Sequence, residues 1–391
     1  TVGALGNPHV RTPAVDALCA EGVAFTRVYV QNPLCTPSRA CFLTGRYPAA
    51  HRVFRNGDTL FPPGEVPVSR LFAEAGYHCG LVGKLHLAAP VGGTEARVED
   101  GYRTWRWSFM PRPEDGTSAH NAYHHWLRGK GVDPVELFAE VDAFLGPGVP
   151  AALHQTTWAA EEAAGFIHEH RGEPWFLNVN PFAPHHPFDP APEYLERYDA
   201  ELLPHPLFRE SDLARQPAFR RIQHNTVEAI DPTVRLAGDG DPRRFDGRWE
   251  NCLTVGHYYG RDVKAAYYAM IEHLDGALGQ LVAALEETGQ RENTIVLYTS
   301  DHGEQLGDHG LIFKGCRFFE GAVRVPLVIA WPAQFVRGVV SSGLVEEIDL
   351  APTLLEAAGL AVPPYMQGVS LTPMLGGGTD PDAHKEWVIC H

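Results

Sequence analysis

The feature that most constrains the fold is the alternation of strand-like and helix-like segments along the chain. Periodic apolar positions predict helices, and short apolar or alternating runs predict strands. No internal repeat interrupts this order. Such alternation indicates a layered α/β fold. The predicted helices cover 13–21, 68–75, 263–288 and 349–358, and the predicted strands cover 23–30, 77–82, 175–179, 294–298 and 325–330, with 294–298 the clearest buried strand.

Composition and charge exclude several classes of function. The chain has 391 residues with 32 basic and 48 acidic side chains, which gives a formal net charge of −16. A field of this sign repels nucleic-acid phosphates and acidic membrane surfaces, so we expect no nucleic-acid partner. No apolar stretch reaches the roughly 18 residues of a membrane-spanning helix. The seven cysteines form no Cys-x-x-Cys pair and predict no disulfide framework.

A cysteine lies at the expected start of a short helix in the segment 35–46, CTPSRACFLTGR. Thr36 is expected as the N-cap, with Pro37 in the first helical position. Cys35 would then lie just before a helix N-terminus, where free N–H groups and the helix dipole stabilise an anion. Arg39 adds a positive charge one turn later. For a cysteine considered alone, a buried structural role is the simpler interpretation.

The whole segment resembles the signature Cys-x-Pro-Ser-Arg-x-x-x-Leu-Thr-Gly-Arg of the type I sulfatases, in the alkaline-phosphatase-like superfamily. The resemblance implies an α/β fold with a mostly parallel central sheet flanked by helices. It also implies hydrolysis of sulfate monoesters, as in arylsulfatases. In that family a maturation enzyme oxidises the cysteine to formylglycine, so Cys35 is expected to be modified. One divalent cation is implied, with Ca²⁺ preferred over Mg²⁺ or Mn²⁺.

A second segment, GYHCGLVGKLH at 76–86, resembles the second sulfatase signature, which ends in Gly-Lys-x-His. Lys84 and His86 follow the strand predicted at 77–82. In an extended segment, residues two apart point to the same face. An ammonium beside an imidazole suits a sulfate oxygen and a proton transfer. In isolation, a solvated lysine and an incidental histidine would be the simpler interpretation.

A carboxylate and an imidazole follow the strand predicted at 294–298. Asp301 and His302 offer an oxygen and a nitrogen ligand for a divalent ion. The string SDHGEQLGDHG that contains them resembles the second metal motif of the family. The resemblance implies that Asp301, His302 and the residue made from Cys35 bind the cation.

Two more positions match the family's substrate contacts. Lys314 lies where the family places a sulfate-contacting lysine, and His185 matches its Pro-His-x-Pro pattern after the strand predicted at 175–179. The resemblance implies that Lys84, Lys314 and Arg39 neutralise charge on the sulfuryl oxygens. It implies that His185 protonates or hydrogen bonds the leaving oxygen. His86 is implied as the general base.

Several polar residues near these motifs are expected to have no catalytic role. His186 is expected to face solvent. Asp308 and His309 resemble a second metal pair, but are expected to belong to loop structure or to the pocket rim. Arg324 is expected to be a buried ion-pair partner.

Parts of the family pattern have no match in the chain. The family's first strand, which ends in one or two aspartates of the metal site, would precede Thr1, and a C-terminal subdomain would follow His391. We therefore expect a single sulfatase-like α/β domain over 1–391 that lacks both parts. Insertions are expected at about 99–171 and 190–260, over one end of the sheet. In this form the metal site would lack a carboxylate.

Two other functions remain open. Phosphonate or phosphate monoester hydrolases of the superfamily share Cys-x-Pro-Ser-Arg, although the phosphonate-cleaving branch resembles this chain less at Lys84 and His86. A non-catalytic homologue that binds sulfated glycans is the other alternative. The expected substrate is a small-molecule or saccharide sulfate ester. Two interpretations stay open for a group of aromatic and histidine residues: they line a sugar or aryl pocket, or they simply pack in loops. These residues are Trp105, Trp107, His120, His124, His125 and Trp126.

Overall fold

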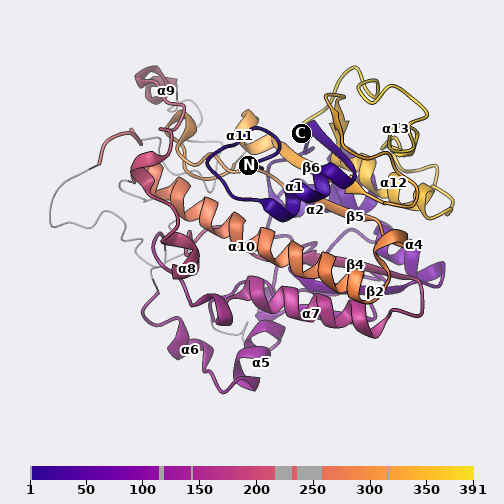
Figure 1. The fold of residues 1–391 in the computed structure, drawn as a ribbon, viewed down its shortest axis with the longest axis horizontal. Helices are drawn as coiled ribbons and strands as arrows, with labels where there is room; N and C mark the ends of the chain where they lie inside the picture. Colours follow the sequence, from indigo (N-terminus) through magenta and orange to yellow (C-terminus); the bar gives the residue numbers. More distant parts are fainter. Residues whose placement is uncertain (1, 114–118, 142–143, 216–230, 236–257, 316) are drawn as a thin grey trace.

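The computed structural model describes residues 2–113, 119–141, 144–215, 231–235, 258–315 and 317–391 (Figure 1). The strands are β1 (Val23–Tyr29), β2 (His78–Gly83), β3 (Thr104–Trp107), β4 (Trp175–Asn180), β5 (Val296–Thr299), β6 (Arg324–Ala330), β7 (Val339–Ser341) and β8 (Val345–Glu346). The helices are α1 (Pro13–Glu21), α2 (Cys35–Thr44), α3 (Pro48–His51), α4 (Val68–Glu74), α5 (Ala122–Gly129), α6 (Pro134–Leu137), α7 (Gln155–Glu169), α8 (Pro192–Leu195), α9 (Glu210–Arg215), α10 (Gly260–Glu287), α11 (Glu320–Val323), α12 (Leu350–Ala357) and α13 (Thr372–Leu375). None of the helices in these ranges has the length and apolarity needed to span a bilayer.

The strands form two sheets. In the smaller sheet, the order β3-β2-β4 is parallel throughout. In the larger sheet, the order is β5-β6-β1-β7, and β8 pairs with the end of β1. Strands β7 and β8 run parallel to β1, whereas β6 is antiparallel to both β1 and β5. The α/β fold expected from the sequence is therefore confirmed, with β6 as the antiparallel exception.

Helices cover both faces of the sheets (Figure 1). On β2, Leu81 packs in a core with α2, α4 and α12, while its neighbour Val82 packs in a core with α5 and α7. On β1, Ala24 packs against α1 and Phe25 packs on the opposite side with α12. This alternation follows from the two-residue period of a strand, and it buries apolar side chains on both faces.

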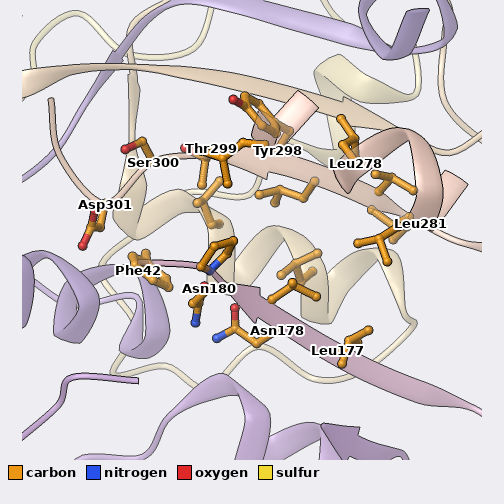
Figure 2. Close-up of a pocket in the computed structure, with 18 of the residues that line it drawn as sticks. Phe42, Leu177, Asn178, Asn180, Leu278, Leu281, Tyr298, Thr299, Ser300 and Asp301 are labelled. Atoms are coloured by element: carbon orange, nitrogen blue, oxygen red, sulfur yellow. The ribbon is translucent and has the colours of Figure 1, made fainter. Parts of the chain in front are cut away.

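A cavity of about 1250 Å³ separates the two sheets between β4 and β5. Among the described strands, β4 pairs with β2 alone and β5 pairs with β6 alone, so each leaves one edge without a partner. Figure 2 shows the two strands running toward the same end of this cavity, where Asn180 and Asp301 lie. Leucines of α10 line it, among them Leu278 and Leu281. We call this space the β4–β5 groove.

The groove explains why the prediction of a buried strand at 294–298 is wrong. Every residue of β5 is half-buried, as is every residue of β4. The segment 294–298 is therefore not a fully buried strand, because its free edge borders the groove. The other predicted strands and helices form within a few residues of the expected bounds.

The structure describes most of the first expected insertion, but only part of the second. The range 99–171 contributes β3 to the smaller sheet and α7 to the layer that covers it, so this stretch belongs partly to the sheet layers. Much of 190–260 lies outside the described residues. Five cysteines are described, and all five are free thiols, which agrees with the predicted absence of a disulfide framework in that part of the chain.

Candidate functional site

The first turn of α2 places Cys35 at the site. The N-cap is Leu34, whose backbone is extended and whose carbonyl accepts the N–H of Ser38 at 3.0 Å. The helix therefore begins at Cys35, and the predicted N-cap at Thr36 is wrong because Thr36 already lies inside the helix. Gly45 closes the helix in the left-handed conformation.

Basic groups surround the sulfur of Cys35. The side chain is buried, and its Sγ lies 3.1 Å from Nε2 of His302. Burial alone would raise the thiol pKa, but the positive charges of Lys84 and Lys314, followed by His302, hold the pKa of Cys35 well below its ordinary value. The site thus stabilises a negative charge at position 35.

Asp301 and His302 follow the end of β5 and face the same sulfur. Oδ2 of Asp301 accepts a hydrogen bond from Nε of Arg39 at 2.8 Å. Although burial raises the pKa of Asp301, Arg39 and His302 lower it to about 2, so the carboxylate is ionised. Nδ1 of His302 donates to the carbonyl of Gly303 at 2.8 Å, and Nε2 faces the sulfur of Cys35. Burial lowers the pKa of His302, but the negative charges of Asp301 and Cys35 raise it above its ordinary value, which favours a proton on Nε2 beside the anionic sulfur.

These groups form a donor set that fits a divalent cation. The ligand atoms of Cys35, Asp301 and His302 all lie within 4.8 Å of one another. The ionised carboxylate supplies a hard oxygen, and Nε2 of His302 would supply a nitrogen ligand after losing its proton. The set contains one carboxylate, whereas Ca²⁺ takes six to eight oxygen ligands. The described residues therefore provide part of a cation site.

Lys84 and His86 lie just beyond β2 and also reach the sulfur. The ammonium of Lys84 lies 4.8 Å from the ring centre of Phe109 and 5.4 Å from that of Phe182. His86 hydrogen bonds with Cys35, and burial lowers the pKa of this imidazole to about 4, with a further contribution from Lys84. The sequence analysis placed Lys84 and His86 together because it took the segment as extended. The segment is instead a turn, since His86 has a φ of 57°.

Lys314 and His185 complete the ring of side chains. Nζ of Lys314 is buried and has no hydrogen-bond partner among the described residues. Nδ1 of His185 donates to the carbonyl of His186 at 2.6 Å, and the ring hydrogen bonds with Cys35. Burial and the charge of Lys314 lower the pKa of His185 to about 3. The structure therefore brings together all the site residues that the sequence analysis selected.

For the residues that were expected to have no catalytic role, the predicted surroundings are right in some cases and wrong in others. His186 does not face solvent, because its ring packs 4.2 Å from that of Phe313. Arg324 is not buried: half of its side chain is exposed, and it pairs with Glu320 at 3.3 Å. Asp308 and His309 do belong to loop structure. Asp308 accepts the N–H of Leu207, and the ring of His309 stacks on that of Phe319.

Trp105 and Trp107 lie in β3, and His124, His125 and Trp126 lie in α5. Nε1 of Trp107 and that of Trp126 donate to Glu95 and Glu161, and His124 bonds the carbonyl of Pro111. These contacts favour the packing alternative for the residues concerned.

Sequence reasoning missed several residues that support the site. Oγ of Ser38 donates to Oε2 of the buried Glu347 at 2.7 Å, which ties α2 to the segment before α12. The amide of Asn180 and Oε1 of Glu304 are buried and have no hydrogen-bond partner among the described residues. Ser38 belonged to a quoted motif, but Glu347 and Asn180 belong to none, so no local signal marked them.

Comparison with known proteins assigns the family. The sulfatase family model matches residues 1–360. An arylsulfatase from Clostridium perfringens is 29% identical over 386 residues, which are 96% of this chain and 75% of that protein. A multifunctional alkaline phosphatase superfamily protein from Trinickia caryophylli is 30% identical over 400 residues, covering 97% of this chain and 74% of its own length.

Solved structures agree with this assignment. A phosphonate monoester hydrolase from Silicibacter pomeroyi superposes with a TM-score of 0.77 at 26% identity, over 97% of this chain and 74% of that chain. The corresponding enzyme from Agrobacterium radiobacter gives the same TM-score and identity, over 98% and 76%. Sulfatases generally use a metal and a formylglycine. Because the family model spans most of the chain, the protein belongs to the sulfatase family, the sulfuric ester hydrolases of the alkaline-phosphatase-like superfamily.

Proposed function

We propose that this chain hydrolyses sulfate monoesters at position 35, after a maturation enzyme has converted Cys35 to formylglycine. The observation that carries the proposal is the convergence of two lysines, three imidazoles and a carboxylate on one buried sulfur. When present, the hydrated aldehyde supplies the hydroxyl nucleophile, and a divalent cation stabilises negative charge on the reacting oxygens. The arylsulfatase relative supports a sulfate ester as substrate.

Asp301 and His302 are the residues that would hold the cation together with position 35. The ionised carboxylate favours a hard ion, and Ca²⁺ is our first choice. Carboxylate ligands also suit Mg²⁺ and Mn²⁺. Reconstitution of metal-free protein with Ca²⁺, Mg²⁺ or Mn²⁺ separates these ions by the activity that each restores.

Lys314 and Lys84 neutralise the sulfuryl oxygens of the substrate. The ammonium of Lys314 is buried without a partner, so an anionic oxygen would satisfy it. For Arg39 we infer a positioning role in addition to charge neutralisation. Its Nε binds Asp301, and its Nη1 donates to the carbonyl of Lys84 at 2.8 Å. Arg39 therefore orients Asp301 and the Lys84 turn, and its charge acts on substrate from behind these groups.

His185 and His86 handle protons on the two sides of position 35. The pKa of each is lowered by burial, so both are neutral in the free site and can accept a proton. Because the sulfate group is an anion, its binding raises the pKa of a neighbouring imidazole. His185 can then donate a hydrogen bond or a proton to the leaving oxygen, while His86 serves as the base at position 35.

The β4–β5 groove is the proposed place of a strand that precedes residue 1. A strand parallel to β4 and β5 would pair with both free edges and join the two sheets. Leu5, near the start of the chain, already lines this groove, and Asp301 lies at its end. A carboxylate at the end of such a strand would add the oxygen ligands that the cation site needs. Amide exchange of 175–180 and 296–299 should be slower in a chain extended upstream.

Two measurements test the sulfatase proposal. Both use a protein that is extended upstream of residue 1 and is produced together with a maturation enzyme. Mass spectrometry of the peptide that contains position 35 should show the thiol replaced by an aldehyde. Release of sulfate from an aryl sulfate should require that change, and the Cys35→Ala variant should be inactive. An intact thiol in a protein that cleaves sulfate esters at full rate would disprove the mechanism.

A phosphonate monoester hydrolase is the second candidate. The two solved phosphonate monoester hydrolases and the multifunctional relative favour it. The same ring of cations fits a phosphonate monoanion, so we expect some hydrolysis of both ester types. Rates on an aryl sulfate and on an aryl phosphonate decide which is the main activity. Binding of sulfated glycans without hydrolysis of either ester would support the non-catalytic alternative.

A further inference from the structure

A buried carboxylate lies beneath the turn that carries Lys84 and His86. Glu95 is 2% exposed, and its two oxygens accept four N–H donors. Oε2 accepts the N–H of His86 at 2.8 Å and the indole N–H of Trp107 at 3.1 Å. Oε1 accepts the N–H groups of Leu87 at 2.5 Å and Ala88 at 3.0 Å. Burial raises the pKa of Glu95, and the four donors oppose this shift by stabilising the carboxylate, whose two oxygens each act as an acceptor for two of them.

The backbone at this turn needs such a partner. His86 has a φ of 57°, in the left-handed region that costs a non-glycine residue about 1–3 kcal/mol. Three consecutive N–H groups then point toward one side of the chain and form a concave anion site. Without Glu95 they would be buried donors with no acceptor, which is itself costly. The carboxylate therefore stabilises the conformation that directs the His86 ring.

We propose that Glu95 is a positioning residue, which acts on the reaction by holding the imidazole of His86 beside position 35. This inference rests on the proposed role of His86. Leu85 and Leu87 anchor the same segment in the core with Leu81, so the fold has other support at this point. The carboxylate controls the turn between these anchors and touches no reacting atom.

The test is the variant Glu95→Gln. The amide oxygen can still accept two N–H groups, but the amide nitrogen must face the other two donors. We expect kcat to fall about 10- to 100-fold, as when a group that orients a metal-binding histidine is removed, with KM nearly unchanged. In histidine-labelled protein, the NMR signals of the His86 ring should shift or broaden, while those of the remote His168 stay in place.

A double-mutant cycle separates positioning from a general loss of stability. If Glu95 acts through His86, Glu95→Gln should slow the wild type but not the His86→Ala variant. Glu272→Gln is the matched control, because Glu272 is a similarly buried glutamate on α10, bonded to Arg197 at 2.6 Å. Glu272→Gln should lower the free energy of unfolding and leave kcat unchanged. Equal slowing by Glu95→Gln in both backgrounds would overturn the proposal.

Two further variants keep the test decisive if Glu95→Gln folds poorly. Glu95→Asp retains the charge and should preserve more kcat than Gln. Trp107→Phe removes one donor and should reduce kcat less than either. If Glu95→Asp loses as much kcat as His86→Ala while the His86 signal stays unchanged, this result would also count against the proposal. If wild-type protein fails to hydrolyse sulfate esters, the proposed function fails, whereas the NMR comparison still decides whether Glu95 positions His86.

Discussion

Sγ of Cys35 lies 3.1 Å from Nε2 of His302, although 267 positions separate the two residues in the chain. The contact joins the first turn of α2 to the loop that follows β5. It places a group stabilised as an anion next to an imidazole whose pKa is raised by Asp301 and Cys35, although its burial lowers it. The site therefore depends on how α2 and β5 are held relative to each other.

The buried ammonium of Lys314 should contribute to catalysis and not to stability. Lys314→Met removes a charge that has no hydrogen-bond partner among the described residues, so the free energy of unfolding should stay the same or increase. The value of kcat/KM should fall about 100- to 1000-fold, as for loss of one donor to a developing anion. Urea unfolding and steady-state kinetics with an aryl sulfate measure the two effects.

Lys264 provides the control for that variant. It is similarly buried on α10, but its ammonium contacts the carbonyls of Pro204 and His205 at 3.4 and 3.3 Å. Lys264→Met should lower stability and leave kcat/KM unchanged. The same kinetic loss in both lysine variants would contradict the role of Lys314.

Gly83 should tolerate no side chain at the end of β2. Its φ is 101°, and an added Cβ would lie 2.0 Å from the carbonyl oxygen of Asn180. Gly83→Ala should therefore lower the free energy of unfolding by about 2 kcal/mol or more. Gly165→Ala, in α7, meets no atom within 4 Å and should raise it by about 0.5–1 kcal/mol. Chemical denaturation measures both, and a Gly83→Ala variant as stable as wild type would refute the clash.

The packing of α7 against α10 should be lost in acid. Burial lowers the pKa of His273 to about 4 and that of His154 to about 3, against about 6.5 in an unfolded chain. The folded state thus binds fewer protons than the unfolded state, so stability should be constant above pH 6.5 and fall as the pH drops from 6.5 toward 4. Each histidine contributes up to about 1.4 kcal/mol per pH unit in that window.

One contact explains why His154 stays neutral: its Nδ1 accepts the N–H of Thr156 and so caps α7. Nε2 of His273 donates to Oγ1 of Thr157 at 2.9 Å, since that hydroxyl donates to the carbonyl of Ala151, and burial keeps the other ring nitrogen of His273 unprotonated. His273→Gln should reduce the slope of unfolding free energy against pH, measured by urea titration at several pH values. An unchanged slope in this variant would show that His273 is not the titrating group.

Removal of the cation should abolish activity without unfolding the protein. Chelation of the extended, matured protein should stop sulfate release, and added Ca²⁺ should restore it. Saturating Ca²⁺ should also raise the melting temperature, because the ion binds only the folded state. In Asp301→Asn both effects of Ca²⁺ should be weaker, since the hard oxygen ligand is neutral. Full activity in the presence of excess chelator would argue against a metal-dependent reaction.

Much of the site was predictable because its residues lie in contiguous motifs. Cys35 and Arg39 share one short helix, Lys84 and His86 share one turn, and the neighbours Asp301 and His302 follow one strand. Helical period, strand period and glycine stops are local properties, so the sequence by itself determined the longest helix, α10, and five of the eight described strands, but it did not determine β3, β7, β8 or α7. The family resemblance of these strings then indicated which side chains converge.

Only the tertiary structure decided how these local pieces meet. The left-handed turn at His86 depends on Glu95, which belongs to a different loop, and the ion pair of Arg39 with Asp301 joins residues 262 positions apart. The half-exposure of β5 follows from its free edge at the β4–β5 groove. Strand pairing and buried hydrogen bonds between distant residues depend on the whole packed chain, and no local period encodes them.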